Sequence, residues 1–132
     1  MNRNVINPQD LFVGKAFSQT VAVEGAARWI FVSGQIDCDA QGKVRNPGDL
    51  AAQVRGTLDN LVIALAAQGA TMADLVKVNV YIVDLDPSQT AAIRDIRAEY
   101  FDAEQPPAVT LVGIDRLSMD GLLVEIEAVA AR

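Results

Sequence analysis

The residues LLVEIEAVA at positions 122–130 constrain the fold most, because their character alternates with a period of two. Successive side chains of a β-strand point to opposite faces of the sheet. One face would carry only core-type side chains, namely Val124, Ile126, Ala128 and Ala130. The other would carry Glu125 and Glu127, and carboxylates are costly to bury without partners or water. This second face is therefore either a solvated surface or the lining of a polar pocket.

Four further segments have strand character, at residues 17–25, 28–36, 74–85 and 106–114. Residues 49–69 and 86–101 read as helices. The first has an apolar stripe and reaches Gly69, and the second begins with Asp86, Pro87 and Gln89, the pattern of a capping box. Segments 106–114 and 122–130 are predicted to form a closing hairpin, which would put Glu125 opposite Leu111 and Glu127 opposite Val109.

The resulting order, β-β-α-β-α-β-β, predicts an α+β fold, a two-layer sandwich in which two helices cover one face of a mixed sheet. The other face would stay uncovered, so we expect it to pack against further subunits. The length of 132 residues predicts one domain over residues 1–132, with residues 1–14 as an N-terminal extension that can be mobile.

Composition excludes several kinds of chemistry. The chain has no histidine, which removes Ser-His and Cys-His nucleophile pairs and most zinc sites, and we expect no metal or cofactor. Its net charge of −6 argues against nucleic acid and anionic membranes as partners. A single cysteine, Cys38, fits a reducing compartment, and no stretch is apolar enough to span a membrane, so we expect a cytoplasmic protein.

Five segments together resemble the reactive intermediate deaminase family (Rid, formerly YjgF, also called endoribonuclease L-PSP). They are VSGQI (32–36), Gln53 with LDNL (58–61), DLVKVNVYIVDL (74–85), PPAVTLVGI (106–114) and LLVEIEAVA, in order over residues 15–131. The resemblance implies a chorismate-mutase-like fold and a homotrimer with small-molecule clefts between subunits. It also implies hydrolysis of reactive enamines and imines, such as 2-aminoacrylate, to a keto acid and ammonia.

The resemblance also implies a site. Its cleft would be lined by Phe17, Ser33, Gly34, Asn79, Arg94, Val109, Leu111 and Glu125. Glu125 would be the catalytic residue that holds the attacking water. Active relatives usually carry Tyr at position 17 and, at 109, an Arg that clamps the substrate carboxylate, whereas this chain has Phe17 and Val109.

Valine cannot replace a charged, two-pronged guanidinium, so we expect weak or no activity on 2-aminoacrylate. Two possibilities follow: Arg94 provides a relocated anion clamp, or the cleft takes an apolar, uncharged ligand. We expect the second, because Phe17, Val109 and Leu111 would form an apolar wall.

Each candidate also has a structural interpretation. Glu125 could be an interfacial glutamate, Glu127 fits a structural role better, and Asn79 could merely link strands. Arg94 and Arg97 fit a solvated helix face. Ser33 has no histidine to activate it as a nucleophile.

Three functions remain open at this point. The chain could be a deaminase or related hydrolase with a substrate other than 2-aminoacrylate, or a trimer that binds a metabolite without turnover. The endoribonuclease or translation-inhibitor activity of some relatives is the third, and it is hard to assemble in an acidic chain with no histidine.

Overall fold

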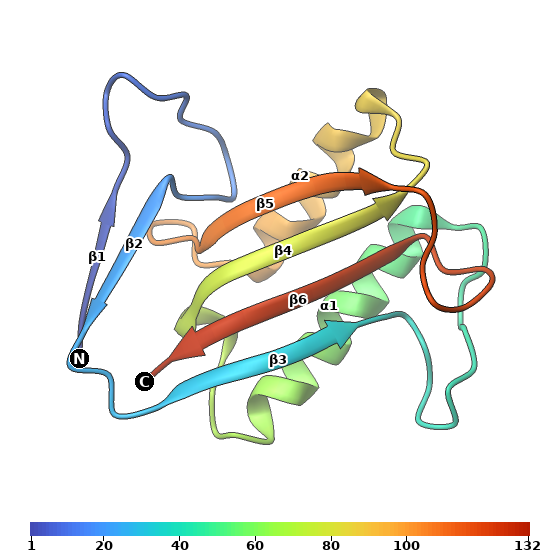
Figure 1. The fold of residues 1–132 in the computed structure, drawn as a ribbon, viewed down its shortest axis with the longest axis horizontal. Helices are drawn as coiled ribbons and strands as arrows, with labels where there is room; N and C mark the ends of the chain where they lie inside the picture. Colours follow the sequence, from blue (N-terminus) through green and yellow to red (C-terminus); the bar gives the residue numbers. More distant parts are fainter.

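The computed structural model describes residues 1–132 and confirms the α+β fold (Figure 1). The strands are β1 (Asn2–Ile6), β2 (Thr20–Glu24), β3 (Trp29–Gln35), β4 (Leu75–Val83), β5 (Ala108–Ile114) and β6 (Val124–Ala131). The helices are α1 (Leu50–Ala66) and α2 (Thr90–Tyr100), each near a short 3-10 turn, η1 (Met72–Asp74) or η2 (Pro87–Gln89). The predicted capping box of Asp86 and Gln89 is present at η2, directly before α2.

The main sheet has the strand order β3-β6-β4-β5, and β1 and β2 form a separate antiparallel pair. Strand β6 is antiparallel to both of its neighbours, whereas β4 and β5 are parallel. The predicted hairpin of β5 with β6 is therefore wrong, because β4 lies between them. The segment β4–α2–β5 is instead a βαβ unit, in which the crossover helix returns the chain parallel to its starting strand.

Both helices cover the same face of this sheet (Figure 1). The alternation predicted for β6 is confirmed, since Val124, Ile126, Ala128 and Ala130 are all buried. They join residues of β4 and the two helices in one core, including Val78, Val80, Leu58, Leu61 and Ile93. Leu75 is also buried in this core, and the register of β4 against β6 shifts between Leu75 and Lys77.

The opposite face of the sheet, called the open face here, has no covering layer in the chain. Its side chains include Phe31, Lys77, Asn79, Tyr81, Thr110, Val112, Glu125, Glu127 and Val129. Phe31 is 79% exposed, although it is a large apolar residue. A surface of this kind is typical of a face that another protein chain covers.

The N-terminal residues are tied to the domain, and the strand β1 was not predicted. Arg3 donates to the carbonyl oxygens of Ala73 at 2.6 Å and Gln105 at 2.8 Å. Buried Ser18 donates its hydroxyl to the carbonyl of Pro106, which fixes the loop between β1 and β2 beside the start of β5. Neither helix has the length and apolar character needed to cross a bilayer.

Candidate functional site

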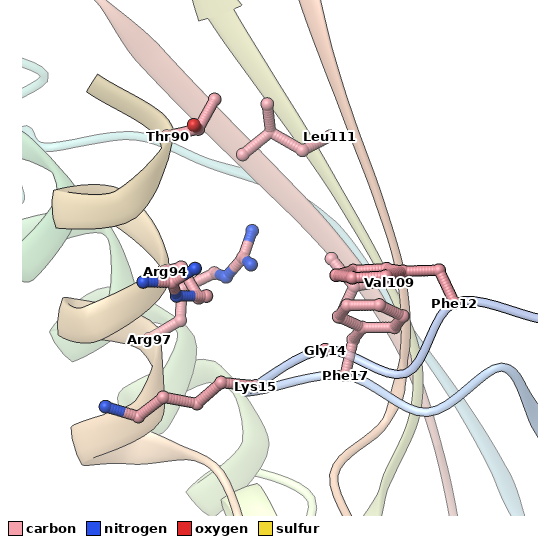
Figure 2. Close-up of a pocket in the computed structure, with 9 residues that line it drawn as sticks. All are labelled: Phe12, Gly14, Lys15, Phe17, Thr90, Arg94, Arg97, Val109 and Leu111. Carbon is pink, nitrogen blue, oxygen red and sulfur yellow. The ribbon is translucent and has the colours of Figure 1, made fainter. Parts of the chain in front are cut away.

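A pocket of about 360 Å³ lies between α2, the helix-facing side of β5 and the loop that precedes β2 (Figure 2). We call it the α2–β5 pocket. Its lining residues are Phe12, Gly14, Lys15, Phe17, Thr90, Arg94, Arg97, Val109 and Leu111. A volume of this size suits a small metabolite.

One wall of the α2–β5 pocket is aromatic and aliphatic. Figure 2 shows the rings of Phe12 and Phe17 beside Val109, across the pocket from the arginines of α2, and the two ring centroids are 6.3 Å apart. Gly14 makes this arrangement possible: a Cβ atom there would lie 2.3 Å from Cε1 of Phe17. Phe17, Val109 and Leu111 therefore do lie together in one wall.

The wall formed by α2 is cationic. Thr90, Arg94 and Arg97 follow one another at helical spacing (i, i+4, i+7), so they share a stripe that faces the pocket. Arg94 is half-buried, and its Nε atom lies 3.4 Å from Oδ1 of Asp95, which also pairs with Lys15.

Arg97 is buried, with only 4% of its surface exposed, so its predicted place on a solvated helix face is wrong. Its Nε and Nη1 atoms are buried without a hydrogen-bond partner, and none of the ion pairs of the chain includes it. Burial, with a smaller effect of the nearby Arg94 charge, lowers the pKa of Arg97 to about 10. The guanidinium therefore remains charged at neutral pH.

The two glutamates of β6 lie on the open face and differ in their partners. Glu127 accepts hydrogen bonds from Nδ2 of Asn79 at 3.0 Å and from the hydroxyl of Tyr81 at 2.6 Å. These bonds lower the pKa of Glu127, with the Tyr81 bond as the larger cause, and the bond to Glu127 raises the pKa of Tyr81. In this chain Asn79 thus links β4 to β6.

Glu125 lies over Gly34 of the neighbouring strand β3. A Cβ atom at position 34 would lie 1.8 Å from Oε1 of Glu125 and 2.6 Å from its Cδ. Only a glycine leaves room for the carboxylate in this position. No side chain or backbone group of the chain donates a hydrogen bond to it, so Glu125, unlike Glu127, is free to bind water or a ligand.

The structure separates the predicted site residues into two groups. Phe17, Arg94, Val109 and Leu111 line the α2–β5 pocket, whereas Gly34, Asn79 and Glu125 lie on the open face, with Ser33 exposed beside them on β3. The predicted opposition of Glu125 with Leu111 is wrong, since Glu125 pairs with Tyr81 of β4 and Leu111 faces the helices.

The sequence analysis missed several lining residues of the α2–β5 pocket, namely Phe12, Gly14, Lys15, Thr90 and Arg97. One sequence pattern could have indicated the arginines of this pocket. Arg94 and Arg97 lie at helical spacing from Thr90 and directly follow the apolar Ile93 and Ile96, which puts both cations at the border of the core-facing stripe. No group of three or more Cys, Asp or Glu side chains is arranged to hold a metal ion.

Comparison with known proteins identifies relatives over nearly the whole chain. Residues 9–132 match the model of the family Endoribonuclease L-PSP. A RutC family protein of Pyrococcus horikoshii is 37% identical over 105 residues, which cover 80% of each chain. TdcF of Escherichia coli, named as a reactive intermediate deaminase, is 35% identical over 106 residues, or 78% of each chain.

Solved structures agree with these sequence relatives. The Rid family protein YyfB of Yersinia pestis, whose function is unknown, superposes with a TM-score of 0.93 at 34% identity over the full length of both chains. A structure of E. coli TdcF with bound serine superposes with a TM-score of 0.68 at 30% identity over 98% of each chain. The chain therefore belongs to the Rid family of proteins, which is also the Endoribonuclease L-PSP family.

Proposed function

We propose that this protein hydrolyses an enamine or imine in a cleft between the subunits of a homotrimer. Glu125 of one copy would face the α2–β5 pocket of the next. The position of Glu125 carries the proposal: its carboxylate is held over Gly34 without a hydrogen bond, while Glu127 beside it is engaged by Asn79 and Tyr81. An unengaged carboxylate of this kind can take a proton from water.

A second copy is needed because one chain does not hold both halves of such a site. The α2–β5 pocket contains cations and apolar side chains, and its nearest carboxylate, Asp95, is paired with Lys15 and Arg94. Glu125 lies on the other face of the sheet. Association through the open face would supply the missing carboxylate and cover Phe31, which is 79% exposed.

The assembly can be tested by sedimentation equilibrium at micromolar concentration. Wild type should have the mass of a trimer, and Phe31→Glu should sediment as a smaller species because it puts a charge into the interface. Ile63→Glu is a matched control, since Ile63 is 67% exposed on α1, which covers the other face of the sheet (Figure 1). A monomeric wild type would contradict the composite cleft.

The proposed reaction needs only acid–base steps. An enamine first takes up a proton from solvent at carbon and becomes the protonated imine. Glu125 would then accept a proton from a water molecule as the water oxygen attacks the C=N carbon. The same carboxyl would give this proton to nitrogen and then accept the hydroxyl proton as the carbinolamine collapses, releasing ammonia and a carbonyl product. No metal or redox group is required, and a positioned carboxylate contributes about 10²- to 10⁴-fold to such proton transfers.

The substrate should differ from 2-aminoacrylate. Val109 stands where the family resemblance implies a carboxylate-binding arginine, and a two-pronged arginine contact is worth about 10²-fold or more in kcat/KM. The serine bound in TdcF supports a small ligand derived from an amino acid. The aromatic wall of the α2–β5 pocket favours one with an apolar side chain.

The test is ammonia release from 2-aminoacrylate and from imines generated in situ from branched-chain and aromatic amino acids. Wild type should favour the larger imines, Glu125→Gln should lose at least 10²-fold in rate, and Glu127→Gln should chiefly weaken assembly. Equal rates for wild type and Glu125→Gln would end the proposal. Ligand binding without ammonia release from any imine would instead support the metabolite-binding alternative.

A further inference from the structure

The buried and unpartnered guanidinium of Arg97 requires an explanation that the fold alone does not provide. Cations are almost never fully buried unless they are paired. Here Nε and Nη1 have no acceptor, and the charge that acts on the guanidinium is that of another cation, Arg94. Burial without compensation opposes folding, so a missing negative partner is the simplest physical reason for such an arrangement.

We propose that Arg97 is the anion-binding residue of the α2–β5 pocket and that its ligand is a small monocarboxylate with an apolar tail. Arg94 and Lys15 also line the pocket and share a single carboxylate, Asp95, so the pocket keeps an excess of positive charge. Three cations thus line one small cavity in a chain whose net charge is −6.

The two ends of this ligand would lie against opposite walls of the pocket. Arg94 and Arg97 lie on α2, while Phe12, Phe17 and Val109 form the opposite wall (Figure 2). A carboxylate against the guanidinium would leave the rest of the ligand in contact with the rings. The cavity of about 360 Å³ accommodates a tail of one aromatic ring or a branched aliphatic chain.

An anion clamp at Arg97 would lie on α2 instead of β5, and the proposed ligand is charged, whereas the sequence led us to expect an uncharged one. Arg94, the alternative clamp suggested by the sequence, is less suited because it is half-buried and lies 3.4 Å from Asp95. Arg97 has no such competitor. The inference rests on the proposed function only in placing the ligand in the same cleft, because binding does not require turnover.

Phenylacetate and phenylacetamide are suitable probes, since they match in shape and differ in charge at pH 7. Their affinities can be measured by NMR titration of the wild-type oligomer at about 150 mM salt. Hydrogen bonds to a charged group are worth about tenfold or more in affinity, so wild type should bind phenylacetate at least tenfold more tightly than phenylacetamide. Arg97→Gln should reduce this preference to less than twofold, and Arg97→Lys should keep part of it.

Arg116→Gln is the matched control, because Arg116 is an exposed arginine paired only with Asp120 on a loop outside the pocket. It should keep the wild-type preference. Equal affinity of wild type for the two probes would overturn the inference, as would a preference that survives Arg97→Gln.

Two further outcomes are distinguishable. If Arg97→Gln dissociates the oligomer and wild type has no preference for the acid, the partner of Arg97 is a carboxylate of a second copy and the inference is wrong. If the variant does not fold, wild type alone still provides a test, since phenylacetate should raise its Tm and phenylacetamide should not. A preference for the acid without ammonia release would uphold the inference while contradicting the proposed function.

Discussion

Substituting Gly34 by alanine should disable Glu125 without touching it chemically. The added Cβ would lie 1.8 Å from Oε1, 2.6 Å from Cδ and 2.8 Å from Cγ of Glu125. These distances are shorter than van der Waals contacts, so the side chain must leave its place over β3. The carboxylate would then no longer point where the attacking water is expected.

The magnitudes for stability and for activity should differ. Overpacking of this kind costs about 1–3 kcal/mol, and Gly34→Ala should be at the low end because Glu125 is only partly buried and can rotate toward solvent. Activity should fall by about 10²-fold or more, which is the range for losing a positioned acid–base group. The variant should therefore be folded and nearly inactive.

A double-mutant cycle tests this reasoning with the ammonia-release assay. Gly34→Ala, Glu125→Gln and the double variant should have similar rates, because each removes the same positioned carboxylate. Gly42→Ala is the control for a glycine substitution that costs stability, since Gly42 has a φ of +81° and nothing within 4 Å of an added Cβ. It should keep its activity.

Three results would refute the reasoning. Gly34→Ala with more than half of the wild-type rate would show that the position of Glu125 does not matter. Losses that multiply in the double variant would show that Gly34 and Glu125 act independently. A crystal structure of Gly34→Ala with the Glu125 carboxylate still over residue 34 would contradict the geometric premise.

Three further predictions concern stability and are measured by urea unfolding. Arg97→Met should raise the free energy of unfolding of the ligand-free protein by about 1 kcal/mol or more, because it removes an uncompensated buried charge and keeps an apolar side chain. A lower free energy of unfolding in the variant would contradict this prediction. Asp37→Ala should lower the free energy of unfolding by about 3 kcal/mol, because the fully buried carboxylate accepts hydrogen bonds from Nε of Arg45 at 2.8 Å and from Nδ2 of Asn46 at 2.7 Å. A loss below about 1 kcal/mol would refute this prediction. Wild type should be more stable than Tyr81→Phe, with the full difference in free energy of unfolding present near pH 6. The difference should shrink as the pH falls below about 4.3, the pKa of a glutamate in the unfolded chain, since the pKa of Glu127 is depressed in the folded protein. A difference that is constant down to pH 3 would argue against this linkage.

Local patterns predicted the elements of this fold well. The period-two alternation of residues 122–130 placed Val124 and Ile126 in the core, and the capping box at Asp86 located the start of the second helical segment. Both signals depend on neighbouring residues and on the fixed geometry of a strand or a helix end. For this reason tertiary context did not change them.

Strand pairing was less predictable because it depends on contacts distant in sequence. A short loop between residues 114 and 122 suggested a hairpin, yet β5 pairs with β4 through the crossover helix α2. This single difference moves Val109 and Leu111 to the helix-facing side of the sheet, away from Glu125. The predicted site residues therefore divide between the two faces of the sheet, and the predicted opposition of Glu125 with Leu111 is absent.

The burial of Arg97 could not be read from composition or helical period. The usual expectation is that an arginine on a helix is exposed, and departures from such expectations are concentrated at functional or strained sites. The loop that carries Phe12 and Phe17 lies across the pocket from Arg97 (Figure 2) and is fixed through Ser18 and Pro106, a contact between residues distant in sequence that no local pattern predicts.

The place of β6 in the sheet has a consequence for biosynthesis. This strand lies between β3 and β4, yet the ribosome makes it last, after β3, β4 and β5. Until it arrives, β3 has no partner in the main sheet and β4 presents an unpaired edge, the kind of template on which nascent chains aggregate. A chaperone that holds the nascent chain would thus be most useful late in translation. A chain truncated before residue 124 would lack β6, so β3 could not join β4 in the main sheet even though both helices are complete.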